Sequence, residues 1–190
     1  MKFHIWEVAT QKKRIVHFKK PIYILQVLEK EYELPKGLLV SILLIETKCR
    51  PLYFRIAEYI AMLIDVIINR IINRPIKNYT VGKCQLGVAS ILNYLGDNIY
   101  PYVEYIPRLN KNQAILLMKA LFSDEYYKIL AYKIKPIYNR AINIYSPLDL
   151  KNVICFIGEQ YNGKYTYGLL LSTIVEEYNN SGQPAGILTE

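Results

Sequence analysis

The strongest constraint on the fold is a short helix that is apolar on nearly every side. It is expected over residues 36–48 (KGLLVSILLIETK). Its apolar positions are Leu38, Leu39, Ile42, Leu43 and Ile45. A helix with so little polar surface is buried on most sides, so other helices have to surround it. Hydrophobic residues make up 52% of the 190-residue chain and charged residues 21%, which is enough apolar material for a sizeable core and excludes a disordered chain.

In most of the remaining chain, the apolar residues have the spacing of an α-helix. Apolar residues recur at three- and four-residue steps, and Pro or Gly stands where several of these patterns stop. The expected helices span residues 22–34, 36–48, 51–73, 86–95, 111–122, 123–144, 146–162 and 166–178. The sequence therefore predicts an all-α protein, with at most a small β element near residues 78–86.

Composition and hydrophobic pattern divide the chain into three parts. Residues 1–20 form a basic N-terminal arm, 21–178 a single helical domain and 179–190 a polar tail. The net charge of +8, from 24 basic and 16 acidic residues, favours an anionic partner such as nucleic acid, a membrane surface or a cell-wall polymer. The three cysteines form no C-x-x-C pair, so we expect neither a disulfide framework nor a metal site, and no cofactor.

The N-terminus has no apolar run followed by a small-residue cleavage site, which is what a signal peptide requires. No apolar stretch reaches the roughly 18 residues of a membrane span. We therefore expect a chain that is made in the cytoplasm without a signal peptide or a transmembrane segment.

Glu46 is the first candidate for chemistry. It follows Leu43 by three residues and Ile42 by four, so it shares their buried face in the last turn of the apolar helix. Burial and the negative end of the helix dipole both favour the protonated carboxyl, as a general acid needs near neutral pH. The alternative is an ion pair with Arg50, one turn further on.

Glu58 and Asp65 share an apolar stripe of the expected helix 51–73. Acidic residues on such a stripe are usually paired with a buried arginine, and Arg50, Arg55 and Arg70 are within sequence reach. A catalytic role is the alternative.

Two further motifs lie at helix boundaries. In TVGKCQLG (residues 80–87), Gly82 permits a tight turn or the close approach of a ligand, and Gln85 can present its amide to solvent or to a sugar. In YNG (residues 161–163), the Asn-Gly pair is typical of a left-handed helix cap.

The order and spacing of these features resemble the lysozyme-like superfamily, most closely its lytic transglycosylase and goose-type lysozyme branch. The resemblance covers roughly residues 36–178. It implies a helical domain in which Glu46 is the general acid and base. It also implies that Thr80, Gly82 and Gln85 line the substrate cleft, and that Tyr161 and Asn162 face the glutamate.

This resemblance implies cleavage of the β-1,4 bond between N-acetylmuramic acid and N-acetylglucosamine in peptidoglycan. An inverting hydrolase needs a second carboxylate roughly 6.5–9.5 Å away, for which Glu58 and Asp97 are the candidates. A lytic transglycosylase needs only one, because the 6-hydroxyl of the sugar attacks, and the sequence slightly favours this chemistry. The protein would reach the wall through lysis, a holin or an injection system.

Two other interpretations remain open. Thr47 stands where the family usually has Ser, and Cys84 where Met or Leu usually precedes the Gln, which would suit an inactive lysozyme-like module that binds within a larger assembly. The basic arm and the 18 tyrosines also allow a nucleic-acid-binding protein, although the sequence contains no recognisable nucleic-acid motif.

Overall fold

The computed structural model describes residues 19–48, 52–82, 84–96 and 104–180. These ranges hold eight helices and two small two-stranded sheets, which confirms the prediction of an all-α protein with a small β element. The predicted basic arm lies almost wholly outside the described residues, as does the tail beyond residue 180.

Contacts divide the chain into two compact units. Unit one holds residues 1–48 and 131–190, and unit two holds residues 49–130. The single domain expected over residues 21–178 stays a prediction.

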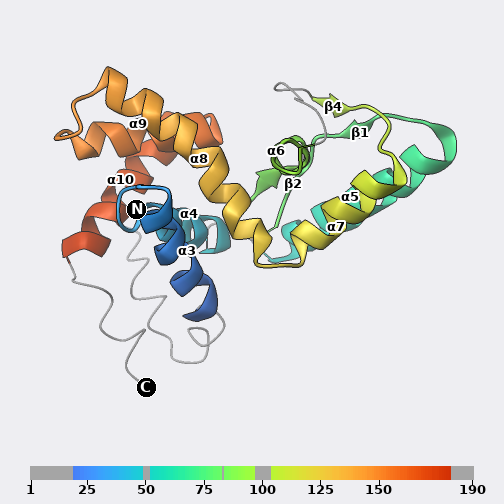
Figure 1. Ribbon diagram of the computed structural model, residues 1–190, viewed down its shortest axis with the longest axis horizontal. Coiled ribbons are helices and arrows are strands. Elements are labelled where there is room, and N and C mark those ends of the chain that lie inside the picture. Colours follow the sequence, from blue (N-terminus) through green and yellow to red (C-terminus); the bar gives the residue numbers. More distant parts are fainter. Residues whose placement is uncertain (1–18, 49–51, 83, 97–103, 181–190) are drawn as a thin grey trace. The chain divides into compact units, whose positions relative to one another are not determined.

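Unit one is built from helices (Figure 1). They are α3 (Lys19–Glu31), α4 (Leu38–Lys48), the part of α8 (Glu125–Ile144) that follows residue 130, α9 (Leu150–Asn162) and α10 (Tyr165–Asn180). Helix α4 is the apolar helix that the sequence predicts, and every residue from Leu38 to Ile45 is buried. It packs against α3 and α10, so it occupies the core of this unit.

The start of α4 is held by a buried carboxyl from α3. Glu29 accepts hydrogen bonds from the backbone N–H groups of Gly37 at 2.8 Å and Leu39 at 2.7 Å. These groups belong to the helix N-terminus, where a negative charge is favourable. Burial nevertheless raises the pKa of Glu29 to about 7, against the opposing effect of these backbone donors.

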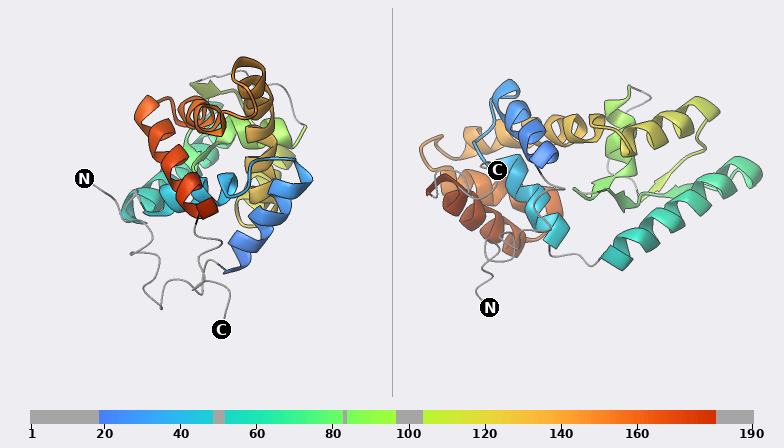
Figure 2. Two further views of the ribbon diagram at one scale, coloured as in Figure 1. Left: turned by 90° about the vertical axis from the view of Figure 1, so that its left-hand side faces the viewer. Right: turned by 90° about the horizontal axis from the view of Figure 1, so that it is seen from below.

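Helices α9 and α10 lie side by side in Figures 1 and 2. Gly163 ends α9 in the left-handed conformation, at φ +78°, and its N–H donates to the Glu159 carbonyl at 2.7 Å. This confirms the cap that the YNG motif predicts. Gly158 and Gly168 let the two helices approach closely, because a Cβ atom on either would overlap the backbone of the other helix.

Unit two combines helices with four two-residue strands. They are α5 (Leu52–Ile72), β1 (Ile76–Lys77), β2 (Thr80–Val81), β3 (Leu86–Gly87), α6 (Val88–Tyr94), β4 (Tyr105–Ile106), α7 (Lys111–Leu121) and the beginning of α8. Strand β1 pairs antiparallel with β4, and β2 pairs antiparallel with β3. Asn110 caps α7 in a reciprocal bond with Gln113, each side chain accepting from the other's backbone N–H at 2.9 Å.

None of the helices in the described ranges has the length and apolarity needed to cross a membrane.

Candidate active site

Glu46 lies in the last turn of α4 and is buried, with 6% of its surface exposed. Its position at the end of an apolar helix is the one the sequence predicts. The neighbouring Thr47 turns its hydroxyl back to its own helix and donates to the Leu43 carbonyl at 2.7 Å. Arg50, the expected ion-pair partner, lies outside the described residues.

Lys133 of α8 interacts electrostatically with Glu46. Burial lowers the pKa of Lys133 to about 8, and the charge of Glu46 acts in the opposite direction. The Lys133 ammonium also lies over the ring of Tyr161, with Nζ 4.6 Å from the ring centroid. Lys133 thus interacts electrostatically with Glu46 and contacts the ring of the tyrosine of the late YNG motif.

Tyr161 lies on the buried side of α9, and its ring centroid is 6.1 Å from that of Tyr167 in α10. Asn162, the next residue, is exposed in the last turn of α9. Of the two late-motif residues, Tyr161 is therefore the one that contacts Lys133, which also interacts electrostatically with Glu46.

The lysine changes what Glu46 can do chemically. A protonated amine near a carboxyl favours the ionised carboxylate, which opposes the effect of burial. A carboxylate accepts a proton, and the same group donates one once it is protonated. One-carboxylate transglycosylase chemistry needs both abilities in turn.

The TVGKCQLG motif forms the β2–β3 hairpin in unit two, with Val81 opposite Leu86. Tyr126 of α8 holds this hairpin through its buried hydroxyl. The hydroxyl donates to the Val81 carbonyl at 2.6 Å and accepts from the N–H groups of Cys84 at 3.3 Å and Leu86 at 3.2 Å. Burial raises the pKa of Tyr126 well above its ordinary value, so the phenol keeps its proton and can donate.

Gly82 and Gln85 complete the turn. Gly82 has φ +83°, and a Cβ atom there would overlap the Tyr126 ring. Both the backbone conformation and the space available therefore favour glycine at this position. Gln85 is buried and its amide donates to the Gly82 carbonyl at 3.0 Å. The alternative in which this amide faces solvent is therefore wrong for this structure, whereas its contact with a sugar stays a prediction. Thr80 is exposed.

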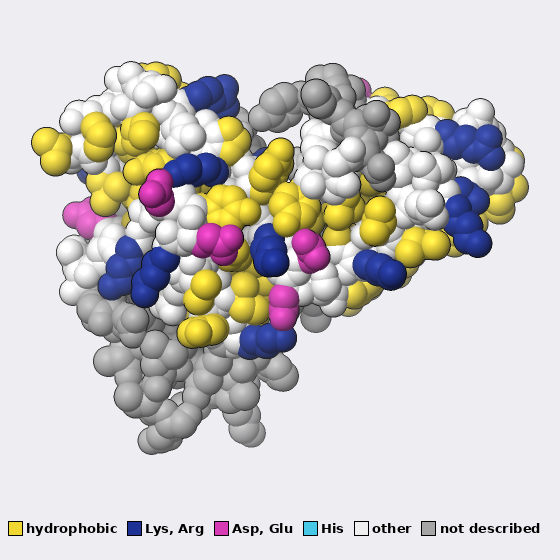
Figure 3. Space-filling view, viewed as in Figure 1, with side chains coloured by type: hydrophobic (Ala, Val, Ile, Leu, Met, Phe, Trp, Pro, Cys, Tyr) yellow, Lys and Arg dark blue, Asp and Glu magenta, His cyan; other side chains and the backbone are white. Residues whose placement is uncertain are grey.

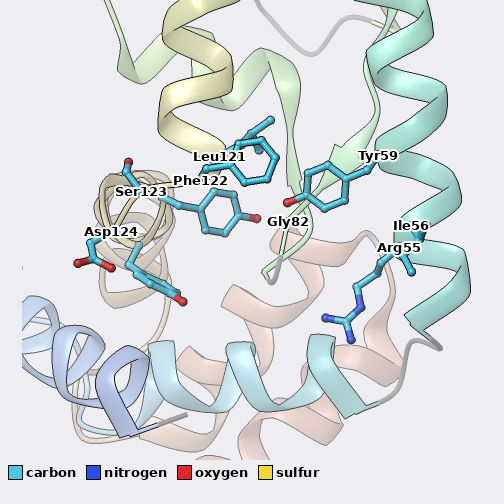
Figure 4. A pocket seen from close by; sticks show the side chains of 10 residues that line it. Arg55, Ile56, Tyr59, Gly82, Leu121, Phe122, Ser123 and Asp124 are labelled. Atoms are coloured by element: carbon cyan, nitrogen blue, oxygen red, sulfur yellow. The ribbon is translucent and has the colours of Figure 1, made fainter. Parts of the chain in front are cut away.

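A pocket of about 420 Å³ opens beside this turn, entirely within unit two. Its walls come from the start of α5, the hairpin, the end of α7 and the start of α8. They include Arg55, Tyr59, Gly82, Phe122, Asp124 and Tyr127. Figure 4 shows Arg55 and Tyr59 extending from α5 toward the side on which Phe122, Ser123 and Asp124 lie.

The pocket has aromatic walls and two charged groups. The rings of Tyr59 and Phe122 are stacked with centroids 6.1 Å apart. Burial raises the pKa of both Tyr59 and Tyr127, which therefore remain neutral hydrogen-bonding phenols. Flat rings beside a guanidinium and a carboxylate suit a ligand with apolar faces and polar edges, such as a sugar.

The other predicted carboxylates lie on α5 in unit two. Asp65 accepts a hydrogen bond from the Tyr79 hydroxyl at 2.9 Å, in place of the expected arginine. Glu58 is half-buried one residue before Tyr59. Asp97 is outside the described residues. Glu58 belongs to a different unit from Glu46, so its role as a second carboxylate stays a prediction.

The predicted site residues thus form two groups. Glu46, Tyr161 and Asn162 lie in unit one, and Glu58, Thr80, Gly82 and Gln85 lie in unit two. Sequence reasoning missed Lys133. The available signal was its place on α8, because it precedes buried Ile134 by one residue and buried Ile137 by one helical turn. Among the described residues, no group of three or more His, Cys, Asp or Glu side chains is placed to hold a metal ion.

Comparison of the chain with family models, curated proteins and solved structures gave no match. The lysozyme-like resemblance therefore remains a prediction that depends on the residues themselves.

Proposed function

We propose that this protein cleaves peptidoglycan at the β-1,4 bond between N-acetylmuramic acid and N-acetylglucosamine, with Glu46 as general acid and base. The observation that carries the proposal lies in unit one. Lys133 lies over the ring of Tyr161 and interacts electrostatically with buried Glu46, and these are the two residues that the resemblance pairs although they are far apart in sequence.

The chemistry favoured is that of a lytic transglycosylase. Protonated Glu46 donates its proton to the glycosidic oxygen as the bond to C1 of muramic acid breaks. The resulting carboxylate then accepts the proton of the 6-hydroxyl, whose oxygen forms a bond to C1 and closes a 1,6-anhydro ring. No water is consumed, and Glu46 ends in the protonated form in which it began. A nearby lysine supports the second half of this cycle, because it stabilises the carboxylate that must form.

The pocket beside Gly82 supports a carbohydrate ligand independently of Glu46. Tyr59, Phe122 and Tyr127 provide the aromatic surfaces, and Arg55 and Asp124 provide polar groups at the edge. The positive net charge of +8 also suits an anionic wall polymer.

One observation favours the alternative of an inactive lysozyme-like binding module. A half-buried lysine that interacts electrostatically with Glu46 is also what a structural ion pair in unit one would require. In that case Glu46 would stabilise the helical core and would not act on a substrate.

Release of dye from labelled, purified sacculi separates these functions. Wild type should release dye, and Glu46→Gln, which keeps the shape of the side chain and removes the acid, should lower the rate by about a hundredfold or more. Glu159→Gln makes the same change on a half-buried residue of α9 and should leave the rate unchanged. Circular dichroism confirms that each variant is folded.

Glu58→Gln tests the choice of mechanism. It should leave dye release close to that of wild type if one carboxylate is sufficient. A loss as large as that of Glu46→Gln would point to a hydrolase with a second carboxylate. If folded wild type releases no dye, the proposal of cleavage fails and the binding module is the better account.

A further inference from the structure

Helix α5 carries an apolar stripe that is open to solvent. Its members are Tyr53, Ile60, Ile64, Ile67 and Ile71, at helical spacings of three, four and seven residues. Each is at least half exposed, from 50% for Ile64 to 75% for Ile71. The opposite side of α5 is already packed in unit two, where Met62, Val66 and Asn69 are buried. An exposed aliphatic surface of this length marks a site of interaction.

A cluster of cations lies at the C-terminal end of the same helix. Its members are Arg70, Arg74, Lys77, Arg108 and Lys111, all exposed. Residues 104–111 are tied to this end of α5, because Arg70 donates to the Leu109 carbonyl at 3.5 Å and the Leu109 N–H donates to Asn69 at 3.0 Å. Residues 70–77 and 104–111 contain one acidic residue, Glu104. Figure 3 shows Lys and Arg side chains beside hydrophobic ones over the C-terminal part of α5.

We infer that the α5 stripe and this basic cluster dock on the surface of an anionic lipid bilayer. The apolar stripe favours a lipid bilayer over other anionic partners. Nucleic acid and glycan offer negative charge without a continuous hydrocarbon layer, whereas anionic lipids offer both headgroup charge and acyl chains. Helix α5 would lie along the bilayer surface, because Arg55, Glu58, Asp65 and Arg70 prevent it from crossing.

A second copy of the chain fits the same face less well. It could cover the stripe, but association would bring two chains of net charge +8 together and provide no counter-charge for the cluster. An anionic bilayer satisfies the stripe and the cluster at once.

Flotation of the full chain with phospholipid vesicles tests the inference. Wild type should float with vesicles that contain phosphatidylglycerol at low salt, and less with vesicles of phosphatidylcholine alone. The stripe variant Ile64→Gln/Ile67→Gln should bind these vesicles at least about tenfold more weakly than wild type, because two aliphatic side chains no longer enter the bilayer. The control Leu148→Gln/Leu169→Gln likewise replaces two exposed aliphatic side chains with Gln, here in unit one, and should float like wild type.

A charge variant tests the second half of the inference. Arg74→Gln/Lys77→Gln/Arg108→Gln should lose the preference for anionic vesicles, and added salt should weaken wild-type binding in the same way. The inference is overturned if wild type does not float with anionic vesicles, or if the stripe variant floats as well as wild type. A wild-type dimer in light scattering that the stripe variant converts to a monomer, without vesicle binding by either, would assign the stripe to self-association and overturn it as well.

Discussion

Removal of one hydroxyl should destabilise the turn beside the pocket. The Tyr126 hydroxyl makes three hydrogen bonds to the β2–β3 hairpin, with Val81, Cys84 and Leu86. Tyr126→Phe keeps the buried ring and leaves three backbone groups without this partner. Each such bond contributes about 1 kcal/mol, so the free energy of unfolding should fall by about 3 kcal/mol. This is a large part of the stability of an ordinary domain, about 5–15 kcal/mol.

Urea unfolding of the full chain, followed by circular dichroism, measures this effect. The control Tyr53→Phe makes the same chemical change in the same unit, on a side chain that is 66% exposed, and should shift the free energy by less than about 0.5 kcal/mol. If Tyr126→Phe is as mild as this control, the reasoning is refuted, because the hydroxyl then does not hold the hairpin.

Three other substitutions have expected outcomes of their own. Burial raises the pKa of Glu29 from 4.5 to about 7, so between these pH values the folded state keeps a proton that the unfolded chain has released. The free energy of unfolding should therefore fall by about 3 kcal/mol as pH rises across this range. Glu29→Gln should flatten this pH dependence in urea titrations at several pH values. Burial lowers the pKa of Lys133 from 10.5 to about 8, so stability should rise as pH increases from 8 to 10.5, and Lys133→Met should remove this rise in the same assay. Gly82→Ala should lower the thermal midpoint more than Gly96→Ala, because both glycines have positive φ but only Gly82 has a tyrosine ring where the Cβ atom would lie; equal shifts would show that the ring moves aside.

Much of the helical architecture can be predicted from sequence because its signals are local. Apolar spacing gives the body of each helix, and Gly163 marks where α9 ends. Helix α3 ends at Glu31, earlier than the predicted end at residue 34. The short strands β1 and β4 could not be predicted, since two residues carry no periodicity. The helix predicted over residues 123–144 begins at Glu125 in the structure, and the Ser123 hydroxyl before it donates to the Ala120 carbonyl. Pro136 is accommodated within α8.

The candidate site was predictable only in part, for a physical reason. The burial of Glu46 follows from its own helix, because apolar neighbours three and four residues away define the buried face. Its interaction with Lys133 is tertiary, and no local pattern specifies which cation a distant helix brings to a carboxyl. Gln85 has the same limitation, because its amide belongs to the turn only when Gly82 takes its left-handed conformation.

Mass spectrometry of digested peptidoglycan tests the central proposal most directly. Purified sacculi are incubated with wild type and with Glu46→Gln, and the ends of the released muropeptides are identified. We expect 1,6-anhydromuramic acid ends from wild type and none above background from the variant, since one carboxylate supplies and recovers the proton. Reducing ends would contradict the one-carboxylate mechanism, and intact sacculi with both folded proteins would contradict the assignment of cleavage to Glu46.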